Sequence, residues 1–204
     1  MNVDGTNIAN LTNSSDSETM GLWSPDGSKI AFVGEQNGNK DIYIMNSDGG
    51  NPQRLTWDAG WDGWPTWSPD GTKIAFSSYR ESRYQIYVMD ADGSKQDKLI
   101  NSEDDDFSPA WSADGAKIAF TRIPLEGNAD IYVMNADGSN VQRLTDNPAF
   151  DGNCHWSPDG RRIAFASTRD GYTEIYVMNA SGSGQTRRTS VPAYHNWPRW
   201  TPAR

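Results

Sequence analysis

Ionisable side chains recur at one place in the sequence, at intervals of 44 or 45 residues. Five residues before each of five regularly spaced tryptophans stand Glu18, Asp62, Asp106, Asp151 and His195. If the carboxylates converge on one point, they form an electronegative site for a cation or a basic peptide end, because a cleft lined with charges of one sign focuses the field. The alternative is that each carboxylate accepts hydrogen bonds from backbone N–H groups of its own loop, as Asp does in turns.

Aromatic side chains in the same segments could supply contact surface for a ligand. Aromatic residues are favoured anchors in protein interfaces, and flat rings also stack on sugars. We expect Trp64 and Trp197, each three residues before one of the spaced tryptophans, to pack between neighbouring repeats instead. The aromatic residues predicted to contact a partner or ligand are Trp57, Trp61, Phe107 and Tyr194, and Phe150 has a similar position.

The elements that must position these residues are copies of one repeat. The motif Trp-Ser-Pro-Asp-Gly begins at Trp23, Trp67 and Trp156, with a variant at Trp111 and a shortened copy at Trp200. Two further landmarks keep the same step: Ile-Ala-Phe begins at Ile30, Ile74, Ile118 and Ile163, and Ile-Tyr-(Val/Ile)-Met begins at Ile42, Ile86, Ile131 and Ile175. Landmarks in register over the whole chain indicate a structural repeat.

Each repeat predicts four short strands. Pro-Asp-Gly forms a tight turn after the tryptophan, and Ile-Ala-Phe is a short apolar run of the kind that is buried on both faces of a sheet. Four strands in about 44 residues match one blade of a β-propeller. We therefore predict an all-β propeller of four-stranded antiparallel blades, with the five motif tryptophans in its core and the acidic segments around the mouth of its central channel.

We assign residues 1–204 to one propeller domain. It consists of a partial blade 1–12, complete blades 13–56, 57–100, 101–145 and 146–189, and a partial blade strand 190–204. We expect the two terminal pieces to supply strands of a reduced closing blade in a five-bladed ring. The alternatives are a fragment of a larger propeller, or an assembly in which another copy of the chain fills the gap, since unpaired strand edges invite pairing.

The sequence offers few residues for metal binding or catalysis. The turn 135–139 begins like a calcium loop but lacks the bidentate Glu that closes one, and the acidic run 103–106 fits a solvated loop. His155 and His195, with Asp151, leave a two-histidine metal site as an alternative. The chain has neither Gly-x-Ser-x-Gly nor His-Glu-x-x-His. We therefore predict no enzyme activity, no catalytic residue and no cofactor, with calcium or another divalent cation at the channel as the alternative.

Composition narrows the choice of partners. The net charge of −9 argues against a nucleic acid, because phosphate binding needs a cationic surface, but it is compatible with a basic protein.

No apolar run approaches the roughly 18 residues that span a bilayer, and no leader stands at the start. The aromatic content of 11% is typical of a folded chain rather than a disordered one. The single cysteine, Cys154, is expected to be a buried thiol.

The repeat motifs resemble those of a known family. Trp-Ser-Pro-Asp-Gly-x-(Lys/Arg)-Ile-Ala-Phe, followed by Ile-Tyr-Val-Met-Asn-Ala-Asp-Gly, is similar to the TolB-type, WD40-like propeller repeat over essentially the whole chain. The resemblance implies a periplasmic or secreted protein and a lipoprotein partner at the outer membrane, although TolB has an N-terminal domain that is not in this sequence. Similar blades also occur in the propeller domains of prolyl-oligopeptidase-like peptidases.

These observations together predict a non-enzymatic binding platform that receives a protein or peptide at the mouth of the central channel. The alternative is an accessory propeller domain or a module that binds a glycan or a cation.

Overall fold

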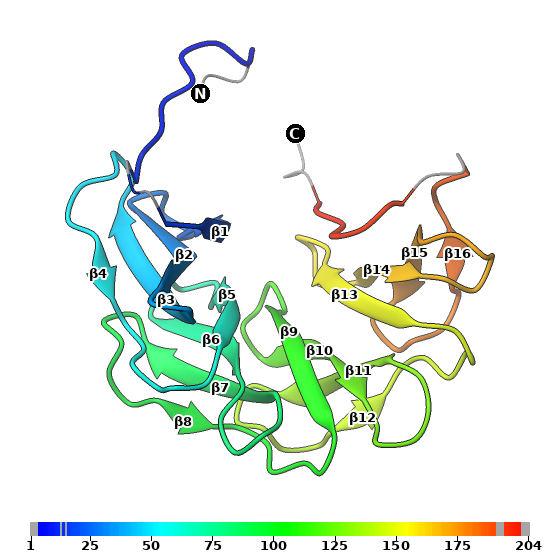
Figure 1. Cartoon of the computed structure of the whole chain (residues 1–204). Helices are drawn as coiled ribbons and strands as arrows, with labels where there is room; N and C mark the ends of the chain where they lie inside the picture. Colours follow the sequence, from blue (N-terminus) through cyan, green and yellow to red (C-terminus); the bar gives the residue numbers. More distant parts are fainter. Residues whose placement is uncertain (1–3, 13, 15, 191–193, 201–204) are drawn as a thin grey trace.

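The computed structural model of the chain describes residues 4–12, 14, 16–190 and 194–200 and contains four antiparallel sheets (Figure 1). Blade 1 consists of β1 (Glu18–Trp23), β2 (Lys29–Gln36), β3 (Asn39–Asn46) and β4 (Gln53–Arg54), and blade 2 of β5 (Asp62–Trp67), β6 (Lys73–Ser78), β7 (Gln85–Asp90) and β8 (Asp97–Lys98). Blade 3 consists of β9 (Asp105–Trp111), β10 (Lys117–Ile123), β11 (Asp130–Asn135) and β12 (Gln142–Arg143), and blade 4 of β13 (Asp151–Trp156), β14 (Arg162–Ser167), β15 (Glu174–Asn179) and β16 (Thr186–Arg187).

In every blade the strands follow one another in chain order, so each blade is a simple meander. The predicted all-β propeller of four-stranded antiparallel blades is therefore confirmed. The part of the chain that the structure describes includes no helix able to cross a membrane.

The repeated Ser-Pro-Asp-Gly turn is held by its own side chains. In blade 2, the Ser68 hydroxyl donates to the Asp70 carboxylate at 2.6 Å, and the same carboxylate accepts the Thr72 amide at 3.0 Å. Gly71 has a φ of +71°, in the left-handed region that favours glycine. These requirements explain why the motif recurs just before the second strand of every blade.

The core lies between the blades. Ile-Ala-Phe in the second strand is buried in all four copies, and Phe76, Phe120 and Phe165 are fully enclosed. Side chains of adjacent blades form shared apolar clusters. In one of them Ile42 of blade 1 packs in the same cluster as Trp67 and Phe76 of blade 2. Burial of these faces requires one blade to stack on the next.

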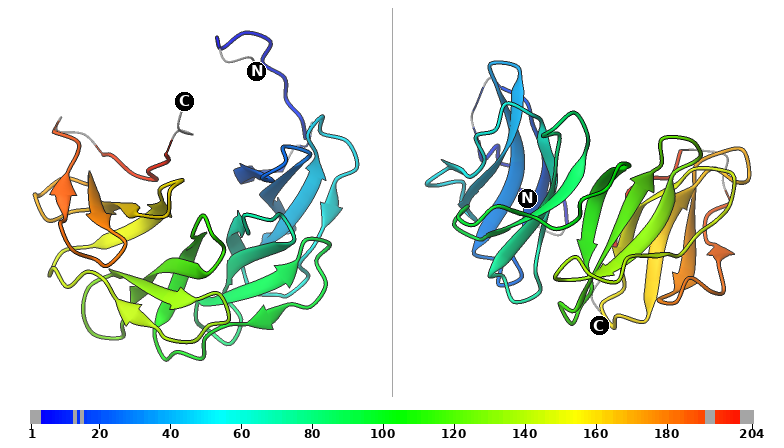
Figure 2. Two further views of the ribbon diagram at one scale, coloured as in Figure 1. Left: turned by 180° about the vertical axis from the view of Figure 1, so that it is seen from behind. Right: turned by 90° about the horizontal axis from the view of Figure 1, so that it is seen from below.

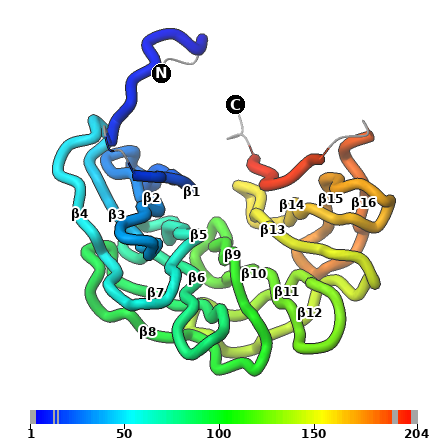
Figure 3. The backbone as a smooth tube through the Cα atoms, viewed as in Figure 1, coloured from blue at the N-terminus to red at the C-terminus, as the bar shows by residue number. Residues whose placement is uncertain are grey.

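The four blades follow an arc around one axis, with β1, β5, β9 and β13 on the inner side and the two-residue fourth strands on the outer side (Figures 1 and 3). An opening separates the terminal segments when the arc is seen from either side (Figures 1 and 2).

The two terminal segments do not form the predicted closing blade of a five-bladed ring within residues 4–12 and 194–200. Each packs on its nearest blade instead. Leu11 lies against Gly49 of blade 1, where an added Cβ would stand 2.6 Å from the Leu11 carbonyl oxygen, whereas the Trp200 indole N–H donates to the His155 carbonyl of blade 4 at 3.1 Å. Residues 1–3, 191–193 and 201–204 of the predicted partial blades lie outside the described residues. Closure by a second copy stays a prediction.

The five motif tryptophans differ in burial, and Trp111 and Trp200 are only partly buried. Trp67 and Trp156 are buried, as predicted, and the Trp67 indole N–H donates to the Leu22 carbonyl of the preceding blade at 3.2 Å. Trp23 is 54% exposed, so its predicted core position is wrong. The indoles of Trp67 and Trp200 donate to the inner strand of the preceding blade, and the described residues place no inner strand before β1 on which Trp23 could pack.

Candidate functional site

The three aspartates at the recurring position lie inside the blades rather than around the channel. Asp62, Asp106 and Asp151 begin β5, β9 and β13, and their side chains are fully buried. Each forms an ion pair within its own blade: with Arg80 at 3.4 Å, with Arg122 at 2.6 Å, and with Arg169 at 2.8 Å. In blade 3 the pair is bidentate, because a second Arg122 nitrogen donates to Asp106 at 2.8 Å.

Each of these arginines also stacks on aromatic rings. The guanidinium carbons lie 4.6, 4.9 and 4.6 Å from the ring centroids of Tyr87, Tyr132 and Tyr176. Burial raises the pKa of the three carboxyl groups, and hydrogen bonds and the arginine charges offset part of this effect. The predicted electronegative funnel is therefore wrong for these residues, since each carboxylate is neutralised where it lies.

The other two residues at this position have different contacts. Glu18 accepts a hydrogen bond from the Thr12 hydroxyl at 3.1 Å, whereas His195 lies 4.0 Å from the Glu174 carboxylate. His155 lines a cavity that His195 does not, and Asp151 pairs with Arg169, so the structure does not group the three residues of the alternative two-histidine metal site. Among the described residues no three His, Cys, Asp or Glu side chains are grouped for a metal ion.

The structure brings some of the predicted aromatic residues together. Trp61 and Phe107 join Trp64 in a cluster with Tyr79 and Tyr84, in which ring centroids are 4.5 to 6.4 Å apart. We call these five residues the aromatic cluster. The sequence reasoning missed Tyr79 and Tyr84 because they flank the loop between β6 and β7, away from the segments before the motif tryptophans.

The remaining predicted aromatic residues lie apart from this cluster. Trp57 is 69% exposed and lies 4.3 Å from the Arg54 guanidinium, and Tyr194 is 86% exposed. Phe150 packs over Gly152, where an added Cβ would stand 2.4 Å from the ring.

Each innermost strand contains a bulge that the sequence reasoning did not foresee. In all four blades the pairing between the first and second strands shifts register just before the motif tryptophan. A bulge of this kind redirects side chains. The third residue before each motif tryptophan adopts a left-handed φ of 50° to 57°, which is uncommon for residues other than glycine: Met20, Trp64, Ser108, Asn153 and Trp197.

The bulges are tied to the preceding blades. The backbone N–H of Ser108 donates to the Ser77 hydroxyl of blade 2 at 3.0 Å, and the N–H of Asn153 donates to the Thr121 hydroxyl of blade 3 at 3.1 Å. An amide freed from strand pairing needs such an acceptor when it is buried. The bulges are thereby held in place by contacts between blades.

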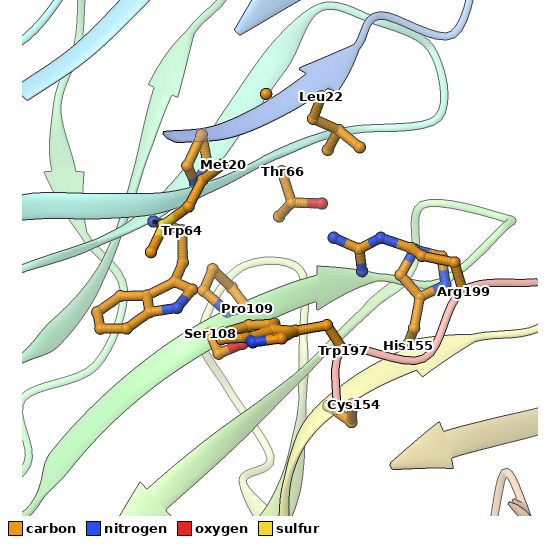
Figure 4. Close-up of a pocket in the computed structure, with 12 residues that line it drawn as sticks. Met20, Leu22, Trp64, Thr66, Ser108, Pro109, Cys154, His155, Trp197 and Arg199 are labelled. Atoms are coloured by element: carbon orange, nitrogen blue, oxygen red, sulfur yellow. Dashed lines mark hydrogen bonds between the residues drawn. The ribbon is translucent and has the colours of Figure 1, made fainter. Parts of the chain in front are cut away.

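The residues at and after the bulges surround a cavity of about 310 Å³, which we call the axial cavity (Figure 4). Its apolar lining comes from the side chains of Met20, Leu22, Trp64, Pro65, Pro109 and Trp197. Its polar lining comes from Thr66, Ser108, Cys154, His155 and Arg199. Among the described residues, Arg199 is the one charged residue that lines it, and its guanidinium points toward Thr66 (Figure 4). Trp64 packs on Phe107 of the next blade, as predicted, whereas Trp197 is 44% exposed, and both line the axial cavity.

The imidazole in the axial cavity is neutral near pH 7. Burial, together with the nearby Arg199 charge, lowers the pKa of His155 to about 4. Its Nδ1 lies 3.0 Å from the Trp156 carbonyl oxygen, which favours the proton on Nδ1 and leaves Nε2 as an acceptor. Cys154 is buried, as predicted, and burial raises the pKa of its thiol to about 12.

Replacing Asp106 with Ala should lower the free energy of unfolding by about 3 kcal/mol, because Arg122 would stay buried without its counter-charge. As a control, Glu35→Ala removes the exposed carboxylate 3.8 Å from Lys40 and should cost less than about 1 kcal/mol. Urea denaturation followed by tryptophan fluorescence measures both changes. Equal losses for the two variants would contradict a structural role for the buried pair.

The His155 environment predicts a dependence of stability on pH. Between pH 6.5 and 4 the unfolded chain binds a proton at His155 that the folded chain does not, so the free energy of unfolding should fall as the pH is lowered through this range. The expected loss is about 1 to 3 kcal/mol. His155→Asn should lose less stability over the same range, since other groups titrate equally in both proteins. Parallel pH profiles from urea titrations would refute the assignment.

Comparison with known proteins agrees with this architecture. The family model described as the TolB beta propeller domain matches residues 1–123 and 96–204. A putative TolB from Agrobacterium tumefaciens is 30% identical, with a TM-score of 0.74 over 81% of this chain and 62% of that one. TolB from Acinetobacter baumannii is 24% identical, with a TM-score of 0.79 over 94% of this chain and 49% of that one. The chain thus spans less than two thirds of either structure.

Enzymes that contain propellers share the fold at lower identity. A puromycin-hydrolyzing peptidase from Mycobacterium tuberculosis is 15% identical, with a TM-score of 0.72 over 90% of this chain and 30% of that one. No curated protein sequence matches the chain. Since the family model covers both halves of the sequence and the four blades have the corresponding architecture, the chain belongs to the TolB β-propeller domain family.

Proposed function

We propose that the chain is a non-enzymatic binding module and that its axial cavity receives a segment of a partner protein. The observation that carries this proposal is the chemistry of the residues that share the left-handed conformation three positions before the motif tryptophans. The blades repeat the same residues where they pack on one another, but the left-handed positions that line the cavity hold different residues: Met20, Trp64, Ser108 and Trp197. Strained backbone that holds non-repeating side chains around one cavity fits recognition better than a need of the fold.

The size and lining of the axial cavity support binding of a small group. Ligand pockets are concave and mostly apolar, with a few placed polar groups, and start at about 300 Å³. The cavity has this character, with two tryptophans and a methionine beside two hydroxyl groups and one arginine. It could therefore accept one or two side chains of a protein segment rather than a whole domain.

The contacts of His155 support binding over catalysis. A histidine that activates a nucleophile is usually oriented by a carboxylate at its other nitrogen. In the described part of the chain, His155 has its Nδ1 against the Trp156 carbonyl instead, and no acidic residue lines the cavity. The related peptidase and lyase folds favour a second candidate, an accessory propeller that binds a small molecule. By family resemblance, we also propose a periplasmic or secreted location.

A displayed peptide library selected on the folded chain tests the proposed function. Selected peptides should bind at least tenfold more weakly to Met20→Ala and Trp197→Ala, because both side chains line the axial cavity. Trp57→Ala and Tyr194→Ala are matched controls, since these aromatic residues are exposed elsewhere and should leave the affinity unchanged.

Fluorescence titration measures the affinities, thermal unfolding checks that each variant folds, and mass spectrometry checks that the peptides stay intact. Equal binding to cavity variants and controls would overturn the proposal, as would cleavage of the bound peptides.

A further inference from the structure

The most informative residue of the axial cavity is Arg199. The other arginines that reach into the blades have acidic partners: Arg54 pairs with Asp41 at 2.7 Å and Arg143 with Asp130 at 2.6 Å, in addition to the three pairs described above. Within the described residues, no carboxylate lies within ion-pair distance of Arg199. Arg199 is exposed to solvent and lines the axial cavity, so its charge there is not neutralised by a carboxylate of the described residues.

The surroundings of Arg199 strengthen its attraction for an anion. Arg199 is exposed to solvent, but apolar side chains form one side of the axial cavity, so an anionic group held between them and the guanidinium is partly shielded from water (Figure 4). His155 is neutral and adds no competing charge. The guanidinium presents a planar set of donors that fits a carboxylate with two parallel hydrogen bonds, and the Thr66 and Ser108 hydroxyls are further donors on the same cavity.

The indole rings of Trp64 and Trp197 favour a ligand that also has an apolar part. They offer apolar surface on the same cavity as the arginine, so a group that carries a carboxylate next to an apolar or aromatic side chain would use both parts of the lining (Figure 4). The net charge of −9 gives no long-range attraction for such a ligand. Recognition must therefore come from the local pair with Arg199 rather than from the overall field.

We propose that the axial cavity recognises a carboxylate that lies beside an apolar side chain in a peptide, with Arg199 as its counter-charge. This inference rests on the proposed function and names the chemistry of the ligand. The ligand charge that it proposes is negative. The recurring acidic residues of the sequence had instead predicted a site for cations or basic peptide ends.

Matched peptides test the carboxylate requirement. Acetyl-Gly-Phe-Asp-Phe-Gly-amide should bind the chain at least tenfold more tightly than the same peptide with Asn in place of Asp. Acetyl-Gly-Phe-Phe with a free carboxylate, compared with its amide, distinguishes a chain terminus from an acidic side chain as the source of the carboxylate. Isothermal titration calorimetry measures each affinity.

Arg199 variants test whether this residue provides the counter-charge. Arg199→Gln should remove the preference for acid over amide, and Arg199→Glu should favour the peptide with Lys in place of Asp. Arg161→Gln is the control, because Arg161 is exposed and does not line the cavity. Thermal unfolding confirms that each variant folds.

The two proposals fail in different ways. If acid and amide peptides bind equally and Trp197→Ala weakens both, the cavity binds peptides but the carboxylate inference is wrong. If no acidic peptide binds at millimolar concentration, the carboxylate inference is also wrong. The proposed function is then tested separately by the binding of the library peptides to the cavity variants. If Arg199→Gln keeps the preference for the acid, Arg199 is not the counter-charge.

Discussion

The bulged residues around the axis are held in place by hydrogen bonds from the backbone of an inner strand to a hydroxyl of the preceding blade. A left-handed conformation at residues other than glycine costs on the order of 1 kcal/mol, and it persists where surrounding contacts hold it. In blades 3 and 4 those contacts are the bonds from Ser108 to Ser77 and from Asn153 to Thr121. The stacking of the blades and the shape of the cavity are thus coupled.

The coupling varies around the arc. Trp64 donates its backbone N–H to the Met20 sulfur at 3.4 Å, a weaker acceptor than a hydroxyl, and Trp197 uses the side chain of its own neighbour Asn196 at 2.9 Å. The same backbone conformation is therefore reached with different partners. This tolerance allows the residue at each bulge to differ without loss of the fold, which is what a recognition surface built on repeats requires.

Charge is distributed so that the blades are neutral inside and the axis is not. Buried aspartates and arginines pair within each blade, and the aromatic rings stacked on the arginines shield the pairs from water. The three aspartates predicted to line the channel therefore contribute little net charge near the axial cavity. Arg199 sets the local sign there.

The fold followed from the spacing of the motifs, whereas the candidate site did not. Repeats of 44 residues with Ile-Ala-Phe and Asp-Gly turns restrict the chain to stacked four-stranded sheets. The aspartates misled the prediction because their arginine partners come 16 or 18 residues later, at a position that shifts between blades. The bulges could not be foreseen, since a positive φ at Met20 or Trp64 depends on pairing with a neighbouring strand and leaves no mark in residue type.

The central claim is that side chains far apart in the sequence surround one binding cavity at the propeller axis. Nuclear Overhauser effects in a complex with a bound peptide test it most directly. One peptide should show contacts to both the Met20 methyl group and the Trp197 indole, which line the same cavity from opposite ends of the chain. Contacts confined to Trp57 or Tyr194, with none to Met20 and Trp197, would contradict the account.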